Sequence, residues 1–144
     1  MYKHILLPTD GSPLSGNAVC EGIAFAKVIG AEVLGIHVTQ PLHVFAVYPD
    51  MVTDTEGMHD VAEAVAVNAL SSIENRAREN GVDFRGIHAF GERPWEEIIK
   101  TAEAENCDLI VMASHGRKGV TGILLGSETQ KVLTHTKIPV LVIR

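Results

Sequence analysis

Two short segments of this chain gather the residue types that hold phosphorylated ligands. Residues 8–12 read PTDGS, so a carboxylate and two hydroxyl groups flank one glycine. Residues 113–129 read ASHGRKGVTGILLGSET, in which glycines, a basic pair and hydroxyl groups follow one another. Glycine lets backbone N–H groups approach a ligand closely, and the N–H groups at the start of a helix attract an anion. Together the segments predict a site for a phosphorylated ligand.

Single residues within these segments also have structural interpretations. Ser12 precedes a predicted helix, and on its own it is better interpreted as a helix cap. Asp10 either supports the turn or contacts the ligand, and the sequence leaves both interpretations open. His115 is not matched by a nucleophilic serine or cysteine with an orienting acid, so we interpret it as a ligand contact. We therefore assign no catalytic residue.

Five apolar runs must position these segments. Residues 4–8, 33–39, 84–90, 108–113 and 140–143 are continuous apolar stretches of the kind that forms strands buried on both faces. Helical patterns separate them, so the order is β-α-β-α-β-α-β-α-β. Such alternation leads to an open parallel sheet with helices on both faces. We expect one domain over residues 1–144, an α/β fold with a single doubly wound five-stranded parallel sheet.

The ends of the predicted helices carry residues with defined capping roles. The first helix should begin after Ser12, with Pro13 as its first residue, and end at Gly30. The last should begin at Ser127, because residues 127–130 read SETQ and have the form of a capping box. The connection over residues 40–57 is longer than an ordinary βα loop, so we expect a mobile or partner-facing segment there. The buried face of the first helix is expected to carry Leu14, Ala18, Phe25 and Ile29.

Composition and charge argue against several classes of protein. A formal net charge of −6 disfavours binding to the backbone of nucleic acids, which relies on clustered Lys and Arg. No apolar stretch approaches the ~20 residues that a membrane helix needs, so we expect a cytoplasmic protein without a membrane partner. Cys20 and Cys107 are not spaced as a metal-binding pair, and the seven histidines form no metal pattern. We predict no metal site built by the protein alone.

Several nucleotide-binding and catalytic motifs are missing from the sequence. It contains neither a GxxxxGK[ST] P-loop nor a GxGxxG after the first predicted strand. It also lacks GxSxG and HExxH. In open α/β sheets, ligands bind beyond the carboxyl ends of the strands, where the strand order reverses. Both segments singled out above follow predicted strands, so we expect the site at that edge.

Motifs along essentially the whole chain resemble the universal stress protein family. They are the opening KHILLPTDGS, the IHV of the second strand, the G-x-x-P over residues 91–94, DLIVMASHGR and the closing KIPVLVIR. The ATP-binding branch of that family carries G-x2-G-x9-G-[S/T]. This chain has Ala113-x2-Gly116-x9-Gly126-Ser127, so alanine replaces the first glycine. Alanine still offers its N–H group but restricts close backbone approach at that point.

The resemblance implies an adenine nucleotide alpha hydrolase-like fold with strand order 3-2-1-4-5. It also implies a site for ATP, with Mg²⁺ bridging the phosphates, at the carboxyl ends of the first and fourth strands. Arg117 joins the site on electrostatic grounds, because its charge suits a phosphate. The implied residues are Pro8, Thr9 and Asp10 by the base and ribose, Val38 and Met112 around the adenine, and Ala113, His115, Gly116, Gly126, Ser127 and Glu128 along the ribose and phosphates.

The resemblance further implies an ATP-binding regulatory protein of the universal stress type, with the nucleotide acting as a conformational signal to an unknown protein partner. Three other functions stay open. A slow ATPase or autophosphorylating enzyme could use Asp10 with Mg²⁺, whereas a nucleotide-free interaction module is disfavoured by the retained Gly116 and Gly126. A flavodoxin-like redox protein would be expected to carry its phosphate loop after the first strand. We also expect a homodimer through the C-terminal strand, because residues 138–143 would form an unguarded sheet edge.

Overall fold

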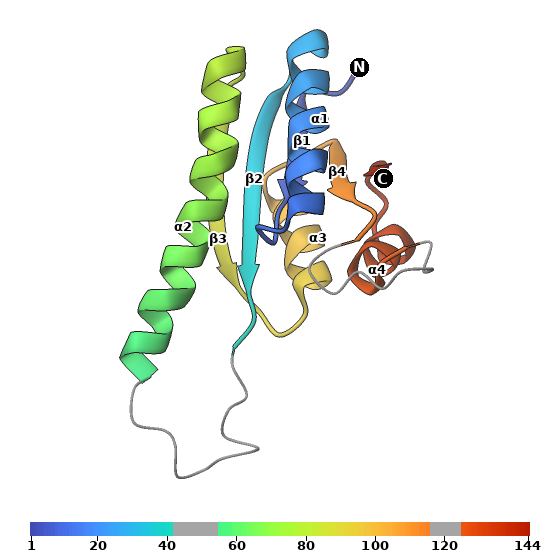
Figure 1. Cartoon of the computed structure of the whole chain (residues 1–144). Helices are drawn as coiled ribbons and strands as arrows, with labels where there is room; N and C mark the ends of the chain where they lie inside the picture. Colours follow the sequence, from blue (N-terminus) through green and yellow to red (C-terminus); the bar gives the residue numbers. More distant parts are fainter. Residues whose placement is uncertain (42–54, 116–124) are drawn as a thin grey trace.

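Five parallel strands form one sheet in the computed structural model of the protein, which describes residues 1–41, 55–115 and 125–144 (Figure 1). Their order across the sheet is β3-β2-β1-β4-β5, and every neighbouring pair is parallel. The predicted fold class and strand order are confirmed. The strands are β1 (His4–Pro8), β2 (Glu32–Thr39), β3 (Phe84–Phe90), β4 (Leu109–Ala113) and β5 (Val140–Ile143).

Helices follow the first four strands, and the ends of the first helix obey the capping chemistry of their residues. In the first helix, the Ser12 hydroxyl accepts a hydrogen bond from the Ser15 N–H group, and Pro13 is the first helical residue. Gly30 closes that helix with a φ of 66°, a conformation that suits glycine. The predicted ends of the first helix are confirmed. The helices are α1 (Pro13–Ile29), α2 (Thr55–Asn80), α3 (Pro94–Ala104) and α4 (Ser127–His135).

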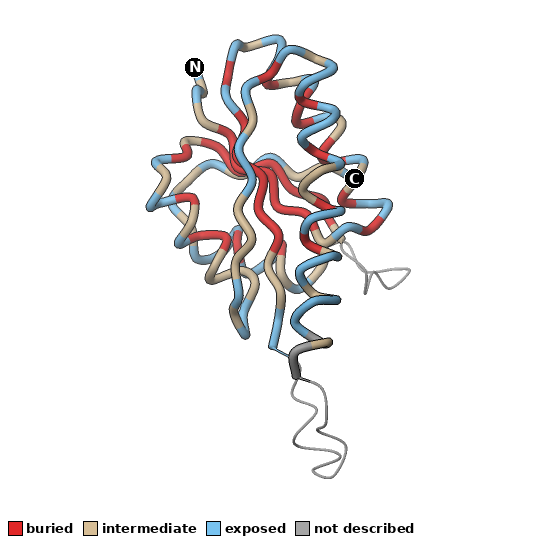
Figure 2. The backbone as a smooth tube through the Cα atoms, turned by 90° about the vertical axis from the view of Figure 1, so that its left-hand side faces the viewer, coloured by how far each residue is buried: buried red, intermediate tan, exposed pale blue. Residues whose placement is uncertain are grey.

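Apolar side chains fill both faces of the sheet. Along β1, Ile5 and Leu7 belong to the cluster under α1 and α2, which run side by side, whereas Leu6 belongs to the cluster under α3 and α4. This alternation is the period of a strand. Figure 2 shows the buried residues concentrated along the central strands. A strand buried on both faces explains why the first apolar run is continuous.

Some details of the predicted elements were wrong. Leu14 is 43% exposed, and the buried face of α1 is formed instead by Ser15, Ala18, Val19, Gly22, Ile23 and Ala26. A Cβ at Gly22 would lie 2.5 Å from a methyl group of Leu7, so any side chain there would force the Leu7 side chain to move. The second helix already begins at Thr55, within the connection expected over residues 40–57. Residues 42–54 of that connection lie outside the described residues.

The start of β4 also differs from the prediction, because Asp108 precedes the strand instead of opening it. Its carboxylate accepts hydrogen bonds from the backbone N–H groups of Lys3 and His4, at 2.8 and 3.0 Å. Asp108 therefore ties the beginning of β1 to the beginning of β4. Among the helices that the structure describes, none has the length and apolarity needed to span a bilayer.

Candidate functional site

Thr9 organises the turn between β1 and α1. Its hydroxyl oxygen accepts a hydrogen bond from the Gly11 N–H group at 3.1 Å and lies 3.1 Å from the Ser15 hydroxyl. Because the Ser15 hydroxyl donates its own proton to the Ser12 carbonyl at 2.9 Å, the Thr9 hydroxyl must be the donor to Ser15. Both hydroxyl side chains are buried. A chain of satisfied buried hydroxyls holds the turn in one conformation.

Asp10 and Ser12 complete this turn. The Asp10 carboxylate accepts a hydrogen bond from the Ser12 N–H group at 2.9 Å, and Gly11 between them has a φ of 77°. Ser12 caps α1, as the sequence predicts, through its 3.2 Å bond from the Ser15 N–H group. Asp10 thus has the supporting role in the turn that the sequence left open. One carboxylate oxygen can support the turn while the other contacts a ligand, so the ligand role stays a prediction.

Backbone contacts join the end of β4 to the start of α4. The Gly126 N–H group donates to the Ser114 carbonyl at 2.7 Å. A Cβ at Gly126 would lie 3.2 Å from that carbonyl oxygen and 3.3 Å from the Cα atom of His115. Glycine at this position therefore allows the start of α4 to lie close to the backbone of Ser114 and His115. Its expected role in admitting a phosphate remains a prediction.

The start of α4 differs from the predicted capping box. Gly126 is the N-cap, Ser127 is the first helical residue, and no side-chain hydrogen bond caps this end in the described part of the chain. Instead, the Thr129 hydroxyl donates to the Ala113 carbonyl at 2.9 Å, and Glu128 accepts from the Trp95 N–H group at 3.0 Å. Because the side chains near the helix start bind other elements, the first N–H groups of α4 are left to attract an anion.

His115 stands beside this helix start with one nitrogen that lacks a partner. Its Nδ1 atom lies 3.2 Å from the Ser114 hydroxyl oxygen. Its Nε2 atom is buried and has no hydrogen-bond partner among the described residues. Unsatisfied buried polar atoms are rare and mark places where a ligand or water completes the structure. The donor set at this end of β4, an imidazole nitrogen with helix N–H groups, fits a phosphorylated ligand.

The remaining predicted site residues fall on adjacent strands. Pro8 ends β1, Val38 is the penultimate residue of β2, and Met112 and Ala113 end β4. Since β1 lies between β2 and β4, all four reach the same edge of the sheet. Met112 belongs to the apolar cluster under α3 and α4, and Val38 packs against that cluster, so both lie on one face. The predicted residues Gly116 and Arg117 lie outside the described residues.

Three residues at this edge were missed by sequence reasoning. Ser15 and Ser114 provide hydroxyls to the two segments, as described above. His37 of β2 is 6% exposed, and its Nδ1 atom lies 3.0 Å from the Thr9 carbonyl oxygen. The sequence signals for His37 were its place in the IHV motif and its polar side chain inside an apolar run, and neither indicated a contact with Thr9.

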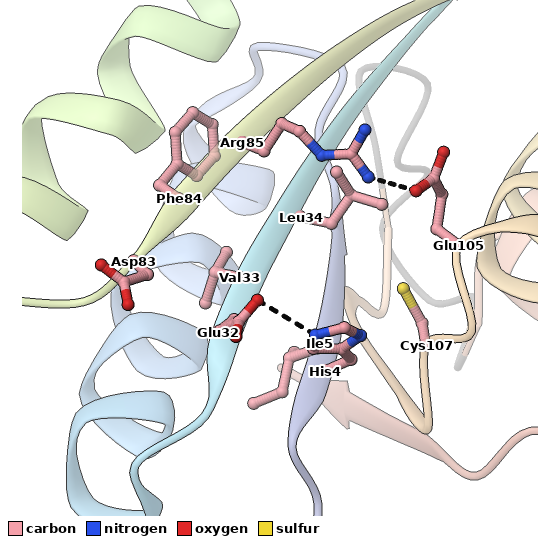
Figure 3. Close-up of a pocket in the computed structure, with 10 residues that line it drawn as sticks. All are labelled: His4, Ile5, Glu32, Val33, Leu34, Asp83, Phe84, Arg85, Glu105 and Cys107. Carbon is pink, nitrogen blue, oxygen red and sulfur yellow. Dashed lines mark hydrogen bonds and ion pairs between the residues drawn. The ribbon is translucent and has the colours of Figure 1, made fainter.

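A cleft lies at the opposite end of the strands, where they begin (Figure 3). This cleft of about 240 Å³ is lined by residues from the starts of β1, β2 and β3 and from the segment before β4. His4 contacts the Glu32 carboxylate at 3.0 Å, and Arg85 pairs with Glu105 across the cleft. Its position at the amino ends separates this cleft from the predicted site.

Among the described residues, no group of three or more His, Cys, Asp or Glu side chains could hold a metal ion. A magnesium ion that accompanies a nucleotide needs only one or two protein carboxylates, because phosphates and water fill its other positions. Asp10, at the mouth of the site, meets that smaller requirement.

Comparison with known proteins identifies the family. The whole chain, residues 1–144, matches the model of the universal stress protein family, so the chain belongs to this family. Universal stress protein MJ0531 of Methanocaldococcus jannaschii is 34% identical over 148 residues, which cover 100% of this chain and 83% of that protein. The universal stress protein in the QAH/OAS sulfhydrylase 3' region of Thermus aquaticus is 33% identical over 144 residues, covering both chains completely.

Solved structures agree with this assignment. The structure of protein MJ0577 has a TM-score of 0.78 and 34% sequence identity, and the match covers 99% of this chain and 96% of that one. Universal stress protein UspA from Lactobacillus plantarum has a TM-score of 0.80 and 24% identity, covering 99% and 98%. The five-stranded α/β fold described above is thus the fold of known universal stress proteins.

Proposed function

We propose that this protein binds an adenine nucleotide, ATP, as a regulatory ligand at the carboxyl ends of β1 and β4. The observation that carries the proposal is the buried Nε2 atom of His115, which has no partner among the described residues beside the uncapped start of α4. An anionic ligand there supplies an acceptor to helix N–H groups and a partner to the imidazole. The strand-order reversal at β1 provides the crevice for the rest of the nucleotide.

The roles of individual residues follow from their positions. The turn of Thr9 and Asp10 lies by the base and ribose, with Asp10 as the carboxylate for a phosphate-bound Mg²⁺. Val38 and Met112, on one face of the sheet, provide apolar contacts to the adenine. The N–H groups of Ser127 and Glu128 open α4 and face the phosphates. Ala113, His115 and Gly126 line the same end, and we extend the site to Gly116 and Arg117 from the sequence.

Known proteins support the proposal at the level of the fold. One universal stress protein has been solved in complex with cAMP, with a TM-score of 0.72 and 24% identity to this chain. Another, from Archaeoglobus fulgidus, has been solved in complex with dAMP, with a TM-score of 0.71 and 19% identity. In those proteins the same arrangement of strands and helices accommodates an adenine nucleotide.

The nucleotide is proposed to act as a signal in a stress response, and no residue is assigned to catalysis. Bound phosphates would contact His115 and the start of α4. The bound nucleotide would act as a conformational signal that a regulatory protein partner in the cytoplasm recognises. The proposal includes the whole chain, 1–144, as one nucleotide-binding domain.

Thermal unfolding with and without ATP and Mg²⁺ tests this function. A ligand that binds only the native state adds about 2.7 kcal/mol of stability at roughly one hundred times its Kd. The parent protein should gain that stability, and His115→Ala should lose most of the gain. His4→Ala is the matched control, because His4 lies at the opposite edge of the sheet. Equal stabilisation of the parent and His115→Ala would contradict the proposed phosphate site.

A further inference from the structure

Both backbone groups of Thr9 are bound to β2. The Thr9 N–H group donates to the Ile36 carbonyl at 2.9 Å, which continues the ladder between β1 and β2. The Thr9 carbonyl is bound by a side chain, the imidazole of His37, whose Nδ1 atom lies 3.0 Å away. A carbonyl oxygen only accepts hydrogen bonds, so the hydrogen must sit on Nδ1 of His37. The histidine tautomer at this place is thereby defined.

This bond sets the orientation of one peptide plane. The peptide bonds of the described residues are trans, so the N–H group of Asp10 points opposite to the carbonyl of Thr9. The carbonyl is directed toward His37 of β2. Since β1 lies between β2 and β4, the Asp10 N–H group is directed toward the β4 side. That side holds His115 and the start of α4.

The imidazole of His37 is itself fixed by its surroundings. It is 6% exposed, so solvent does not readily replace it as a donor to Thr9. Its ring centroid lies 6.0 Å from that of His88 on β3, and the Nε2 atom of His88 lies 2.8 Å from the Thr39 hydroxyl oxygen. The buried His37 imidazole of β2 therefore lies beside the His88 ring of β3 and contacts the turn after β1.

We propose that His37 is a positioning residue of the nucleotide site. By donating from Nδ1 to the Thr9 carbonyl, it orients the Thr9–Asp10 peptide toward the crevice between β1 and β4 without touching the nucleotide itself. The inference rests on the proposed nucleotide site for its effect on affinity. Its effect on the Asp10 amide is independent of any ligand.

Substitution of His37 by asparagine or by glutamine distinguishes the hydrogen bond to Thr9 from simple core packing. In His37→Asn the side-chain N–H lies near the position of Nδ1, so the bond to Thr9 can form. In His37→Gln the N–H lies near the position of Nε2, so the bond is lost although the side chain is larger. His37→Phe provides a second variant without a donor. His88→Gln is the matched control, because it alters the neighbouring ring and leaves the contact with Thr9.

Calorimetric titration with ATP and Mg²⁺ and the backbone amide spectrum of the nucleotide-free protein provide the two measurements. We expect His37→Gln and His37→Phe to bind ATP about fivefold more weakly, the factor that corresponds to one neutral hydrogen bond. His37→Asn and His88→Gln should stay within about twofold of the parent. The Asp10 amide signal should move in the Gln and Phe variants and keep its position in the Asn variant.

The outcomes separate this inference from the proposed function. If the parent binds no ATP, the proposed function fails, and the Asp10 amide signal alone decides the role of His37. The positioning role is overturned if the Asp10 amide signal is unchanged in His37→Gln and His37→Phe, or is displaced equally in all three His37 variants. It is also overturned if the parent binds ATP and His37→Gln and His37→Phe bind it with the same affinity.

Discussion

Several residues of the proposed site also hold other parts of the protein in place. Thr9 connects Gly11 to Ser15 through its hydroxyl, and Gly126 lies against the Ser114 carbonyl. Substituting such a residue changes the local backbone together with any contact to a nucleotide. A Gly126→Val variant therefore tests the joining of β4 to α4 before it tests phosphate binding. An informative substitution must therefore keep the contact within the protein and remove only the proposed contact with the nucleotide.

Asp10 permits such a separation. Asp10→Asn keeps an oxygen that can accept the hydrogen bond from the Ser12 N–H group, but it removes the charge. We expect the midpoint of urea unfolding to stay near that of the parent, while affinity for ATP with Mg²⁺ falls by about tenfold through loss of a charge-assisted contact. Asp10→Ala should lose both affinity and some stability. Unchanged affinity in calorimetric titration of the Asn variant would leave Asp10 with its structural role alone.

Cys107 predicts a pH dependence of stability. Burial, reinforced by the negative charges of Glu105 and Asp108, raises the pKa of its thiol from 9.0 to about 11. Between these values the unfolded chain releases the proton and the folded chain retains it. Stability therefore falls as the pH rises from 9.0 toward 11 and is unaffected by this group below 9.0.

The Cys107→Ala variant isolates this contribution. The urea midpoint of the parent should decrease more steeply than that of the variant as the pH rises from 9.0 to about 11, the interval in which the pKa shift acts. Lysine and tyrosine titrations contribute to both proteins and cancel in the comparison. Parallel pH profiles of the two proteins would contradict the raised pKa.

At the scale of elements, local chemistry was predictable and long-range contacts were not. The ends of α1 follow from neighbouring residues, Ser12 with Pro13 and then Gly30, so the sequence sufficed. The start of α4 did not follow, because Thr129 bonds Ala113, 16 positions away, and Glu128 bonds a residue 33 positions away. Those partners occupy the side chains that a capping box would use.

At the candidate site, too, local features could be predicted from the sequence and long-range contacts could not. Strand ends could be predicted because parallel βα alternation brings carboxyl ends to one edge. The bond from His37 to Thr9 spans 28 positions between two strands, and nothing local signals it. The register of β1 with β2 had to be known first. Sequence reasoning therefore predicted the strand ends at which the candidate site lies but missed the long-range contacts between residues there.

The contact between α4 and β4 can be tested with a pair of threonines on the same helix. Thr129 is 3% exposed, and its hydroxyl binds the Ala113 carbonyl of β4. Thr129→Val should lower the free energy of unfolding by about 1–3 kcal/mol, because a buried hydrogen bond is lost. Thr134 is exposed and bonds only within α4, to the Gln130 carbonyl at 2.7 Å, so Thr134→Val should change stability by less than about 0.5 kcal/mol. Equal urea midpoints for both variants would contradict a stabilising link between these elements.

At the scale of the whole molecule, the two rims of the sheet have different chemistry. At the amino ends, Asp108 contacts β1 and two ion pairs lie in the cleft. The carboxyl ends carry the turn of Thr9 to Ser12, the start of α4 and the buried His115 nitrogen. We therefore expect a nucleotide bound at the carboxyl ends of the strands to leave the contacts at their amino ends intact.

The two outermost strands of the sheet, β3 and β5, also differ in chemistry. At one edge, β3 carries the exposed charge of Arg85. At the other edge, β5 reads VLVI and includes Leu141, which is 39% exposed. Charged side chains discourage strand addition at an edge, and an apolar row without charge favours it. The β5 edge is therefore the better surface for association between two copies of the chain.

We predict a homodimer in which the β5 strands of two chains meet about a two-fold axis, because that arrangement satisfies both unguarded edges with one contact. Light scattering after size-exclusion chromatography should give twice the chain mass of 15.5 kDa. Val142→Lys should shift the protein toward monomer, since two added charges would be brought together across the axis. Val28→Lys is the matched control, because Val28 on α1 is 84% exposed and is not part of the β5 strand. A parent that remains monomeric at high micromolar concentration, or a Val142→Lys protein that stays fully dimeric, would refute this interface.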